Sequence, residues 1–283
     1  ECGHEGTARA YASSLRSMQR YLGKKDFPFI KLSSRIISDY QGKLLASGIC
    51  DNTIGFYLHN IKALFRKGCR EMGLELPCPF RDISIKTEKT LKRSLDPVVI
   101  KTLSAIELEK DSPLSLARDI FMFSFYTRGM SFVDIALLKK RHVFPGEICY
   151  RRHKTDQLMR VGINKEISRI LERYKNVPGE YIFPLFPAER DPYAGYRSAY
   201  HRIRYSLGKI SRVIGLEFPL RLHAARHSWA TIAKVNGASV HVIGECLGHT
   251  SEKTTRIYLK ELDHSALDAV NNQVADFILA VDD

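Results

Sequence analysis

The stretch LHAARHSWAT, residues 222–231, decides how the rest of this chain is interpreted. Its apolar residues recur at intervals of three and four, which predicts an amphipathic helix. His223 and Arg226 lie three residues apart, so a helix places their polar groups on one face. A guanidinium offers a planar, two-pronged donor to a phosphate, and an imidazole adds a third donor. The stretch therefore predicts a helix face that binds phosphate.

Two shorter stretches complete this region of the chain. They read GECLGHT at 244–250 and TTRIY at 254–258, and Tyr258 follows His249 by nine residues. The tyrosine belongs to a short helix expected at 250–259. A tyrosine near two histidines and an arginine predicts a phenol aimed at a bound phosphodiester.

The ordered set H-x-x-R, L-G-H and a tyrosine nine residues later resembles the carboxyl-terminal signature of the tyrosine recombinases, the phage integrase family. Integrases of mobile elements and conjugative transposons are of this kind. The resemblance implies a DNA-cutting enzyme whose Tyr258 phenolate attacks the scissile phosphate and forms a covalent 3′-phosphotyrosine. Arg226, His223 and His249 would neutralise the phosphate oxygens. It implies no metal and no cofactor. The covalent phosphotyrosine stores the energy of the broken phosphodiester bond, so a 5′-hydroxyl can reverse the step without an energy source.

Two further catalytic positions follow from the resemblance. Lys154 lies at the tip of an expected hairpin, RRHKTD (151–156), where the family carries a lysine that protonates the leaving 5′ oxygen. The family's first arginine, in T-G-L-R-x-x-E-L, has no direct counterpart. Matching Asp134 to the acidic position puts Ser131 at the arginine site. Arg128, three residues earlier and about one helical turn away, is the predicted substitute, and Ser131 is the open alternative.

The charge balance favours a polyanionic partner. The chain has 283 residues and a net charge of +13, with 44 Lys and Arg against 31 Asp and Glu. Nucleic acid is the commonest polyanion, and a basic protein without special affinity is the plainer alternative.

Other compositional features predict a protein without a membrane span, and the cysteines predict a cytoplasmic one. No apolar run approaches the roughly 18 residues of a membrane span. The six cysteines are scattered, which predicts reduced and mostly buried thiols rather than disulfides or a zinc site. The chain begins without Met or a signal-peptide core, as expected of a piece of a longer protein.

Three amphipathic helices are expected in the amino-terminal part, at 7–23, 34–47 and 51–73, with Asp51 or Asn52 as the N-cap of the third. They are too short to bury their apolar faces alone, so they predict a small helical bundle. Basic residues of this bundle and of the linker after it are candidate DNA contacts: Arg16, Arg20, Lys62, Arg66, Lys67, Lys92 and Arg93. A solvated helix face is the alternative for each of them.

The remainder of the chain reads as a second, mostly helical domain. Short strands at 143–144, 147–152 and 158–162 predict one small antiparallel sheet. Helices are expected at 97–109, 113–126, 131–139, 164–175, 193–214, 222–236, 239–246, 250–259 and 264–280. The fold class is therefore mainly α, with a SAM-like helical core-binding domain at 1–85, a linker at 86–95 and a catalytic domain at 96–283. The resembling family arranges two such domains as a C-shaped clamp around duplex DNA.

The last expected helix carries its apolar residues on one stripe: Leu267, Val270, Val274, Phe277, Ile278 and Val281. In the resembling family this helix docks into a neighbouring protomer, which implies a tetramer on paired recombination sites. Packing on its own domain is the alternative. DNA-bending accessory proteins are further partners that the resemblance allows. Two other functions stay open, a Xer-like resolvase or invertase with the same chemistry and a DNA-binding relative with impaired catalysis.

Overall fold

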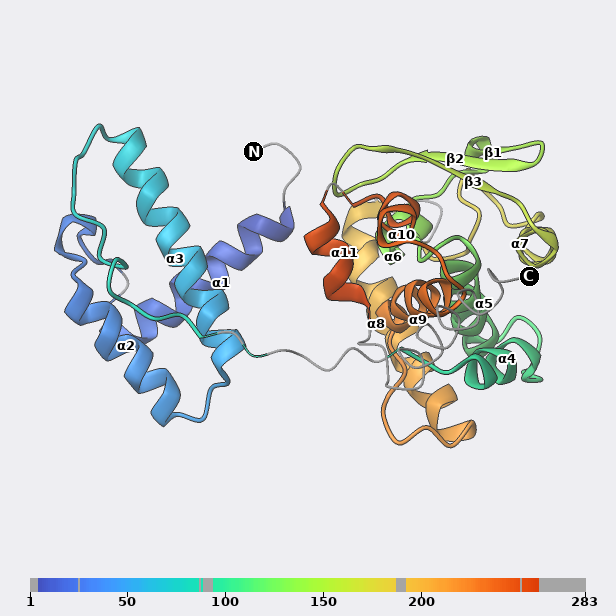
Figure 1. The fold of residues 1–283 in the computed structure, drawn as a ribbon, viewed down its shortest axis with the longest axis horizontal. Coiled ribbons are helices and arrows are strands. Elements are labelled where there is room, and N and C mark those ends of the chain that lie inside the picture. The colour runs from blue at the N-terminus through green and yellow to red at the C-terminus, as the bar shows by residue number, and fades with distance from the viewer. Residues whose placement is uncertain are drawn as a thin grey trace, which may run out of the picture. The chain divides into compact units, whose positions relative to one another are not determined.

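The chain forms two compact units, 1–91 and 92–283, and each is described by itself (Figure 1). The computed structural model describes residues 5–24, 26–86, 88, 94–186, 192–249 and 251–259. Most of the expected linker at 86–95, including Lys92 and Arg93, lies outside these residues, as does the expected tail helix at 264–280. The domain boundaries at 85 and 95 therefore stay predictions.

The first unit contains the three helices that the sequence predicts: α1 (Glu5–Leu22), α2 (Ser34–Ala46) and α3 (Asp51–Glu71), with a 3-10 turn at Phe29–Lys31. The Ser33 side chain caps α2 by accepting the backbone N–H of Ile36. The predicted N-cap of α3 is wrong, because Cys50 occupies that position and Asp51 begins the helix. A carboxylate in the first turn complements the positive end of the helix dipole, which favours Asp51 inside the helix.

The core of the first unit lies where α1 and α2 pack against α3. Its buried residues are Met18, Ile37, Tyr40, Ile54, Leu58, Ile61, Phe65 and Phe80. The Tyr40 hydroxyl is paired inside this core, donating to Ser17 Oγ at 2.8 Å. Because the apolar faces of the helices turn inward, their basic residues are left on the outside of the bundle.

The second unit is mostly helical with a three-stranded antiparallel sheet, as the sequence predicts. Its helices are α4 (Pro97–Ala105), α5 (Pro113–Tyr126), α6 (Phe132–Ala136), α7 (Lys165–Arg173), α8 (Pro192–Val213), α9 (Leu222–Val235), α10 (Val240–Leu247) and α11 (Glu252–Tyr258). Its strands are β1 (Val143–Phe144), β2 (Glu147–Arg151) and β3 (Leu158–Gly162), after a 3-10 turn at Lys140–His142.

Two of the predicted helices are four residues shorter than expected, the largest such differences. The helix expected at 97–109 ends at Ala105, because the chain turns extended at Ile106, whose carbonyl accepts from Arg118 Nη1 at 3.0 Å. The helix expected at 131–139 is only α6, because Ser131 is its N-cap and Lys139 is extended and bridged to Tyr181. In both places tertiary contacts take over from the local helical pattern.

The sheet has the order β1-β2-β3, and β2 pairs with β3 in a register that sets Cys149 opposite Arg160 and Arg151 opposite Leu158. Side chains alternate along both strands, so Ile148 and Val161 enter the core while their neighbours face outward. Figure 1 shows the sheet along one side of the second unit, with the β2–β3 turn reaching toward α10 and α11.

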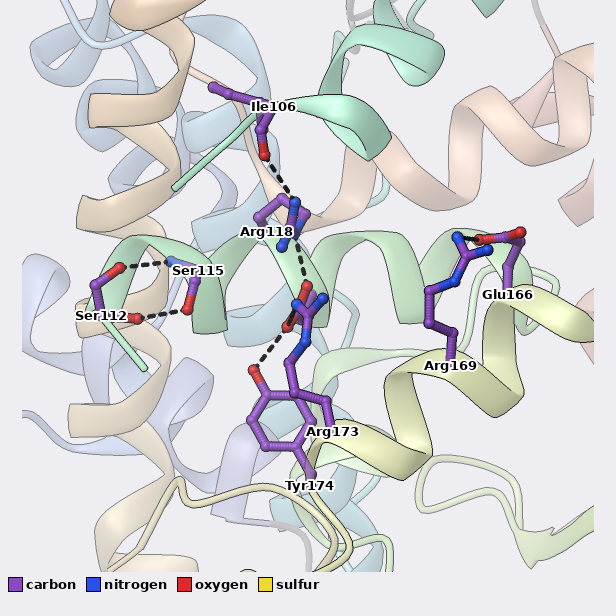
Figure 2. A network of polar contacts seen from close by, with 9 residues as sticks. Ile106, Ser112, Ser115, Arg118, Glu166, Arg169, Arg173 and Tyr174 are labelled. Atoms are coloured by element: carbon purple, nitrogen blue, oxygen red, sulfur yellow. Dashed lines mark hydrogen bonds and ion pairs between the residues drawn. The ribbon is translucent and has the colours of Figure 1, made fainter. Parts of the chain in front are cut away.

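Helix α5 is the centre of the second unit, since α8 and α9 both pack against it. Its Asp119 is 2% exposed and accepts from Arg118 Nε at 2.6 Å, Arg173 Nη1 at 2.5 Å and the Tyr174 hydroxyl at 2.8 Å (Figure 2). A buried carboxylate is costly unless it is paired. These donors therefore tie α5 to the end of α7, and the contact from Arg118 to Ile106 adds the segment after α4.

Two features of composition are tested by the part of the chain that is described. No helix in it is long and apolar enough to cross a membrane. The expectation of mostly buried cysteines is wrong there, since Cys50 is exposed and the four others with described side chains are half-buried: Cys69, Cys78, Cys149 and Cys246. Several lie at helix ends or on the small sheet, where solvent reaches them.

Candidate active site

Arg226 is the buried centre of the site. It lies on α9, is 5% exposed, and donates from Nη1 to the Gly129 carbonyl at 2.8 Å and from Nη2 to the Leu247 carbonyl at 2.5 Å. Its Nη2 also lies 2.9 Å from His249 Nε2. A buried guanidinium needs such partners, and together they fix its plane before any ligand arrives. The predicted closeness of Arg226 and His249 is thus present in the structure.

His249 is held in one tautomer by its neighbours. Because an arginine can only donate, His249 Nε2 must accept from Arg226 and the proton must sit on Nδ1. Nδ1 lies 3.0 Å from Oγ1 of the fully buried Thr255, and this oxygen can accept a hydrogen bond from the Nδ1–H group. Burial lowers the pKa of His249 to about 4, and the charges of Arg226, Arg152 and Lys154 add to the effect. The imidazole is therefore neutral at pH 7 in the DNA-free protein.

The turn before His249 brings the L-G-H segment close to the hairpin. Gly248 ends α10 with a left-handed φ of 63°. A Cβ on it would lie 2.9 Å from Met159 Sδ and 3.3 Å from Gln157 Oε1. Glycine is needed here both for the backbone conformation and for the approach of the β2–β3 hairpin.

The segment between α5 and α6 differs from the prediction. Arg128 and Ser131 are not one helical turn apart, because Arg128 has a φ of 60° in a loop and Ser131 is the N-cap of α6. The half-buried Arg128 points its Nη1 toward the Arg160 carbonyl at 3.4 Å. Ser131 donates to Asp134 Oδ2 at 2.6 Å.

A cavity of about 270 Å³ lies beside this segment, and its lining includes Gly129, Ser131, His223 and Arg226. His223 is exposed, and its ring packs edge-to-face on the buried His227 with centroids 4.8 Å apart. The cavity therefore joins the two residues of the H-x-x-R pattern, as predicted from their spacing. Ser131 lines the cavity, whereas Arg128 is not among its lining residues. Of the two candidates for the role of the family's first arginine, only Ser131 therefore lies at this cavity.

The hairpin carries Lys154 to the edge of the same site. Lys154 is exposed in the turn between β2 and β3, and its charge contributes to the lowered pKa of His249. On one side of the turn the backbone N–H of His153 donates to Asp134 Oδ1 at 2.8 Å. On the other side Arg152 Nη1 donates to the Gly248 carbonyl.

Two tyrosines compete for the role of nucleophile in this region. Burial raises the pKa of Tyr150 far above its usual 10, and the Asp134 carboxylate adds to the rise. Tyr150 therefore stays protonated and is a poor candidate. Tyr258 is the last residue of α11, and its side chain lies outside the described part of the structure. Helix α11 packs on α9 and α10, the helices that present Arg226 and the L-G-H turn.

The predicted DNA contacts of the first unit lie on the outside of its bundle. Arg16, Arg20, Arg66 and Lys67 are exposed and Lys62 is half-buried. Lys67 is paired with Glu71 at 3.6 Å, which leaves its charge partly compensated. Lys92 and Arg93 lie outside the described residues.

Sequence reasoning missed two residues of the second unit's site. Arg152 and Thr255 contact the L-G-H turn from 96 and 6 residues away, respectively. The position of Arg152 just before the hairpin tip could have identified it as a residue of the site. No spacing in the sequence identifies Thr255 in the same way. No group of three or more His, Cys, Asp or Glu side chains that could hold a metal ion occurs among the residues described.

Comparison with known proteins shows which family the chain is similar to. Residues 94–264 match the phage integrase family, and residues 2–80 match the phage integrase SAM-like domain. Tyrosine recombinase XerC of Shewanella oneidensis is 26% identical over 226 residues, which are 76% of this chain and 70% of that protein.

Two solved structures share the fold. A lambda integrase dimer bound to a COC′ core site has a TM-score of 0.66 at 18% identity, covering 89% of each chain. The Tn1549 transposon integrase in complex with transposon right end DNA has a TM-score of 0.66 at 14% identity, covering 95% of this chain and 99% of that one.

The chain belongs to the phage integrase family, because that family's model matches well over half of it. It is a tyrosine site-specific recombinase, an enzyme that breaks and rejoins DNA.

Proposed function

We propose that this recombinase acts as the integrase of a mobile element, cutting duplex DNA through Tyr258. The observation that carries the proposal is the preorganised Arg226, buried in contact with His249 and opening on a cavity shared with His223. A fixed cation at a water-restricted site stabilises charge that develops on a phosphate without having to reorganise. The transposon integrase among the structural neighbours supports the mobile-element context.

In the proposed reaction the Tyr258 oxygen forms a bond to phosphorus as the bond from phosphorus to the 5′ oxygen breaks. The phenol proton leaves to solvent, and Lys154 gives its proton to the departing 5′ oxygen. Arg226 and Arg128 neutralise the non-bridging oxygens, with His223 and His249 donating to them. In the DNA-free protein His249 Nε2 accepts from Arg226, so His249 can donate to the phosphate only after Nε2 is protonated. A bound phosphodiester anion favours this protonation, because it raises the pKa of a nearby imidazole. Rejoining is the reverse, with a 5′-hydroxyl from a partner strand as nucleophile.

The remaining assignments belong to the same proposal. Both the core-binding domain and the catalytic domain contact DNA, with contacts from Arg16, Arg20, Lys62, Arg66, Lys67, Lys92 and Arg93. Recombination takes place in a tetramer on paired sites, joined through the helix expected at 264–280, with DNA-bending proteins as accessory factors. The proposed compartment is the cytoplasm, which the scattered cysteines support.

One specific observation favours a second candidate, a resolvase or invertase with the same chemistry. The relative from Shewanella oneidensis is a tyrosine recombinase XerC. The two functions differ in their sites, so attachment-site repeats in DNA flanking the gene would support the integrase.

Covalent trapping on a nicked suicide site tests the chemistry. Wild-type protein should form an adduct that resists detergent, and Tyr258→Phe should form none while binding the site with nearly unchanged affinity, because only the hydroxyl is lost. Tyr205→Phe is the matched control, since Tyr205 is an exposed tyrosine of the same unit. An adduct from the Tyr258→Phe protein would assign the nucleophile elsewhere. Binding without any adduct from the wild type would support the impaired DNA-binding relative.

A further inference from the structure

The turn that carries Lys154 is closed by its own backbone. Arg152 N donates to the Gln157 carbonyl at 2.9 Å, and Asp156 N donates to the Arg152 carbonyl at 2.8 Å. These bonds fix the shape of the turn, but they do not orient it toward the rest of the site. Its orientation must come from contacts with other elements.

Two such contacts come from the residues immediately before Lys154. The His153 backbone N–H donates to Asp134 Oδ1 at 2.8 Å, and Asp134 is itself held by Ser131 through Oδ2 at 2.6 Å. The half-buried Arg152 side chain crosses to the opposite side and donates from Nη1 to the Gly248 carbonyl. One contact thus links the turn to α6, and the other links it to the residue preceding His249.

The Gly248 contact is tightly packed as well as hydrogen-bonded. Gly248 lies so close to the hairpin that an added Cβ would come within 2.9 Å of Met159 Sδ. The charges of Arg152 and Lys154 both lower the pKa of His249, as expected if the hairpin tip lies near the imidazole. Packing holds the two segments together, and the directional bond from Arg152 selects one orientation.

We propose that Arg152 is a positioning residue that couples the Lys154 turn to the L-G-H turn, so that the general acid and His249 face the same phosphate. Arg152 acts through Lys154 and gives no proton itself. This role rests on the proposed function, because it requires Lys154 to protonate the 5′ oxygen. A guanidinium suits the role, since its planar fork fixes direction where a lysine supplies only a point charge.

The role has a chemical consequence that a purely structural one lacks. Removing Arg152 should slow only the step that needs a proton from Lys154. A displacement of about 1 Å in a catalytic group can cost roughly 10²-fold in rate. If sulfur replaces the bridging 5′ oxygen, the leaving thiolate needs no proton, so the loss should disappear on that substrate.

Single-turnover cleavage at saturating protein tests the proposal with two nicked DNA sites, one ordinary and one with a 5′-bridging phosphorothiolate. Arg152→Met keeps the apolar stem and removes the donor. We expect it to be slower than wild type by roughly 10²-fold on ordinary DNA and nearly equal to it on the phosphorothiolate. Arg160→Met is the matched control, because Arg160 lies on β3 of the same hairpin with a side chain 67% exposed, and it should cleave both sites normally.

Three outcomes would overturn the proposal. An equal defect of Arg152→Met on both substrates would mean that Arg152 does not act through Lys154. A third nicked site carries a methylphosphonate, which removes the charge of a non-bridging oxygen. If Arg152→Met cleaved this site as fast as wild type does, Arg152 would be a phosphate-binding residue instead. Normal cleavage of ordinary DNA by Arg152→Met would show that the contact is dispensable.

Two further variants keep the result interpretable. Lys154→Ala is the benchmark, because failure of the phosphorothiolate to rescue it would overturn the general-acid assignment itself rather than the role of Arg152 alone. Arg152→Lys keeps the charge but not the fork, so it should show a smaller defect that the phosphorothiolate also removes. It replaces Arg152→Met as the test variant if the melting temperature shows that Arg152→Met does not fold.

Discussion

Single side chains decide whether a phosphate bound at this site can be activated, and the first-arginine position is the sharpest case. Ser131 lines the cavity with Arg226, but its hydroxyl is engaged with Asp134. Arg128 carries the missing charge, and its guanidinium is only weakly held at the Arg160 carbonyl, at 3.4 Å. Among the described residues this is the one hydrogen bond of the Arg128 side chain, and so weak a contact lets the side chain turn to a bound phosphate at little cost.

We therefore expect Arg128→Ala to slow single-turnover cleavage by roughly 10²-fold, the usual effect of losing one donor to the charge that develops on the phosphate. Ser131→Ala should slow cleavage far less than Arg128→Ala, because it loosens Asp134 but leaves the Asp134 contact with His153 in place. It should lower the free energy of unfolding by about 1 kcal/mol, because it removes the cap of α6. Saturating protein keeps weakened DNA binding from imitating a chemical defect. Normal cleavage by Arg128→Ala with slow cleavage by Ser131→Ala would assign the role to the serine hydroxyl.

His249 links the stability of the folded protein to pH. Its folded pKa of about 4 lies below its ordinary 6.5, so between these values the unfolded chain binds a proton that the folded chain does not. Stability is therefore full above pH 6.5 and falls as the pH drops toward 4. By pH 5 the loss should be about 1–2 kcal/mol after allowance for partial solvent screening.

Urea unfolding of wild type and His249→Asn at pH 7.5 and pH 5 measures this loss. The contributions of groups common to both proteins cancel in the comparison. The wild type should lose more stability on acidification than the variant by the stated amount. Equal losses would mean that His249 is not held neutral in the folded state.

Residue-level prediction from the sequence succeeded where spacing along one helix decides proximity. The i, i+3 spacing of His223 and Arg226 put both on the cavity. Prediction failed where the backbone leaves the helix, because a left-handed Arg128 is not visible in a helical pattern. It also missed Arg152, whose partner Gly248 is 96 residues away. No periodicity in the sequence reports a contact of that range.

At the scale of elements, the loop between α5 and α6 is shaped around Arg226. Gly129 has a φ of 73°, and a Cβ there would lie 2.6 Å from Arg226 Cγ and 2.8 Å from Arg226 Cα. Its carbonyl accepts from Arg226 Nη1. The loop can hold the guanidinium only because this position has no side chain.

Gly129→Ala should lower the free energy of unfolding by roughly 2–4 kcal/mol, combining left-handed strain with overpacking against a buried side chain. It should also reduce cleavage, because Arg226 must shift. Gly146→Ala is the matched control, since Gly146 has a φ of 83° but nothing within 4 Å of the added Cβ. Gly146→Ala carries only the backbone cost of about 1 kcal/mol. Equal losses in the two variants would show that the loop can relax away from Arg226.

Element boundaries were predictable where a cap and the helical pattern coincide. Pro113 follows the Ser112 cap, and α5 occupies the predicted range of 113–126. The helix predicted at 131–139 was too long. Apolar residues continue after Ala136, but they pack in the core and lead into the β-bridge at Lys139 instead of extending the helix. A pattern of apolar residues does not distinguish a helix from a buried turn of similar composition.

The whole molecule carries a charge of +13, and this excess should govern how it binds DNA. Each phosphate neutralised releases condensed counterions, so the logarithm of affinity falls linearly with the logarithm of salt concentration. With six or more phosphate contacts, affinity should fall at least about 10³-fold between about 50 and 200 mM salt. The exposed Arg16, Arg20 and Arg66 of the first unit belong to these proposed contacts.

Replacing Arg16, Arg20 and Arg66 together by Ala should reduce the magnitude of the salt slope by about 2–3, since each lost contact removes about 0.9. Arg35→Ala is the control for charge alone, because Arg35 is 91% exposed on α2 and is not among the proposed contacts. Its slope should match the wild type within error. Fluorescence anisotropy with a duplex site across the salt range measures both slopes. A triple variant with an unchanged slope would remove these three arginines of α1 and α3 from the DNA-binding surface. A flat wild-type profile would contradict binding through the phosphate backbone.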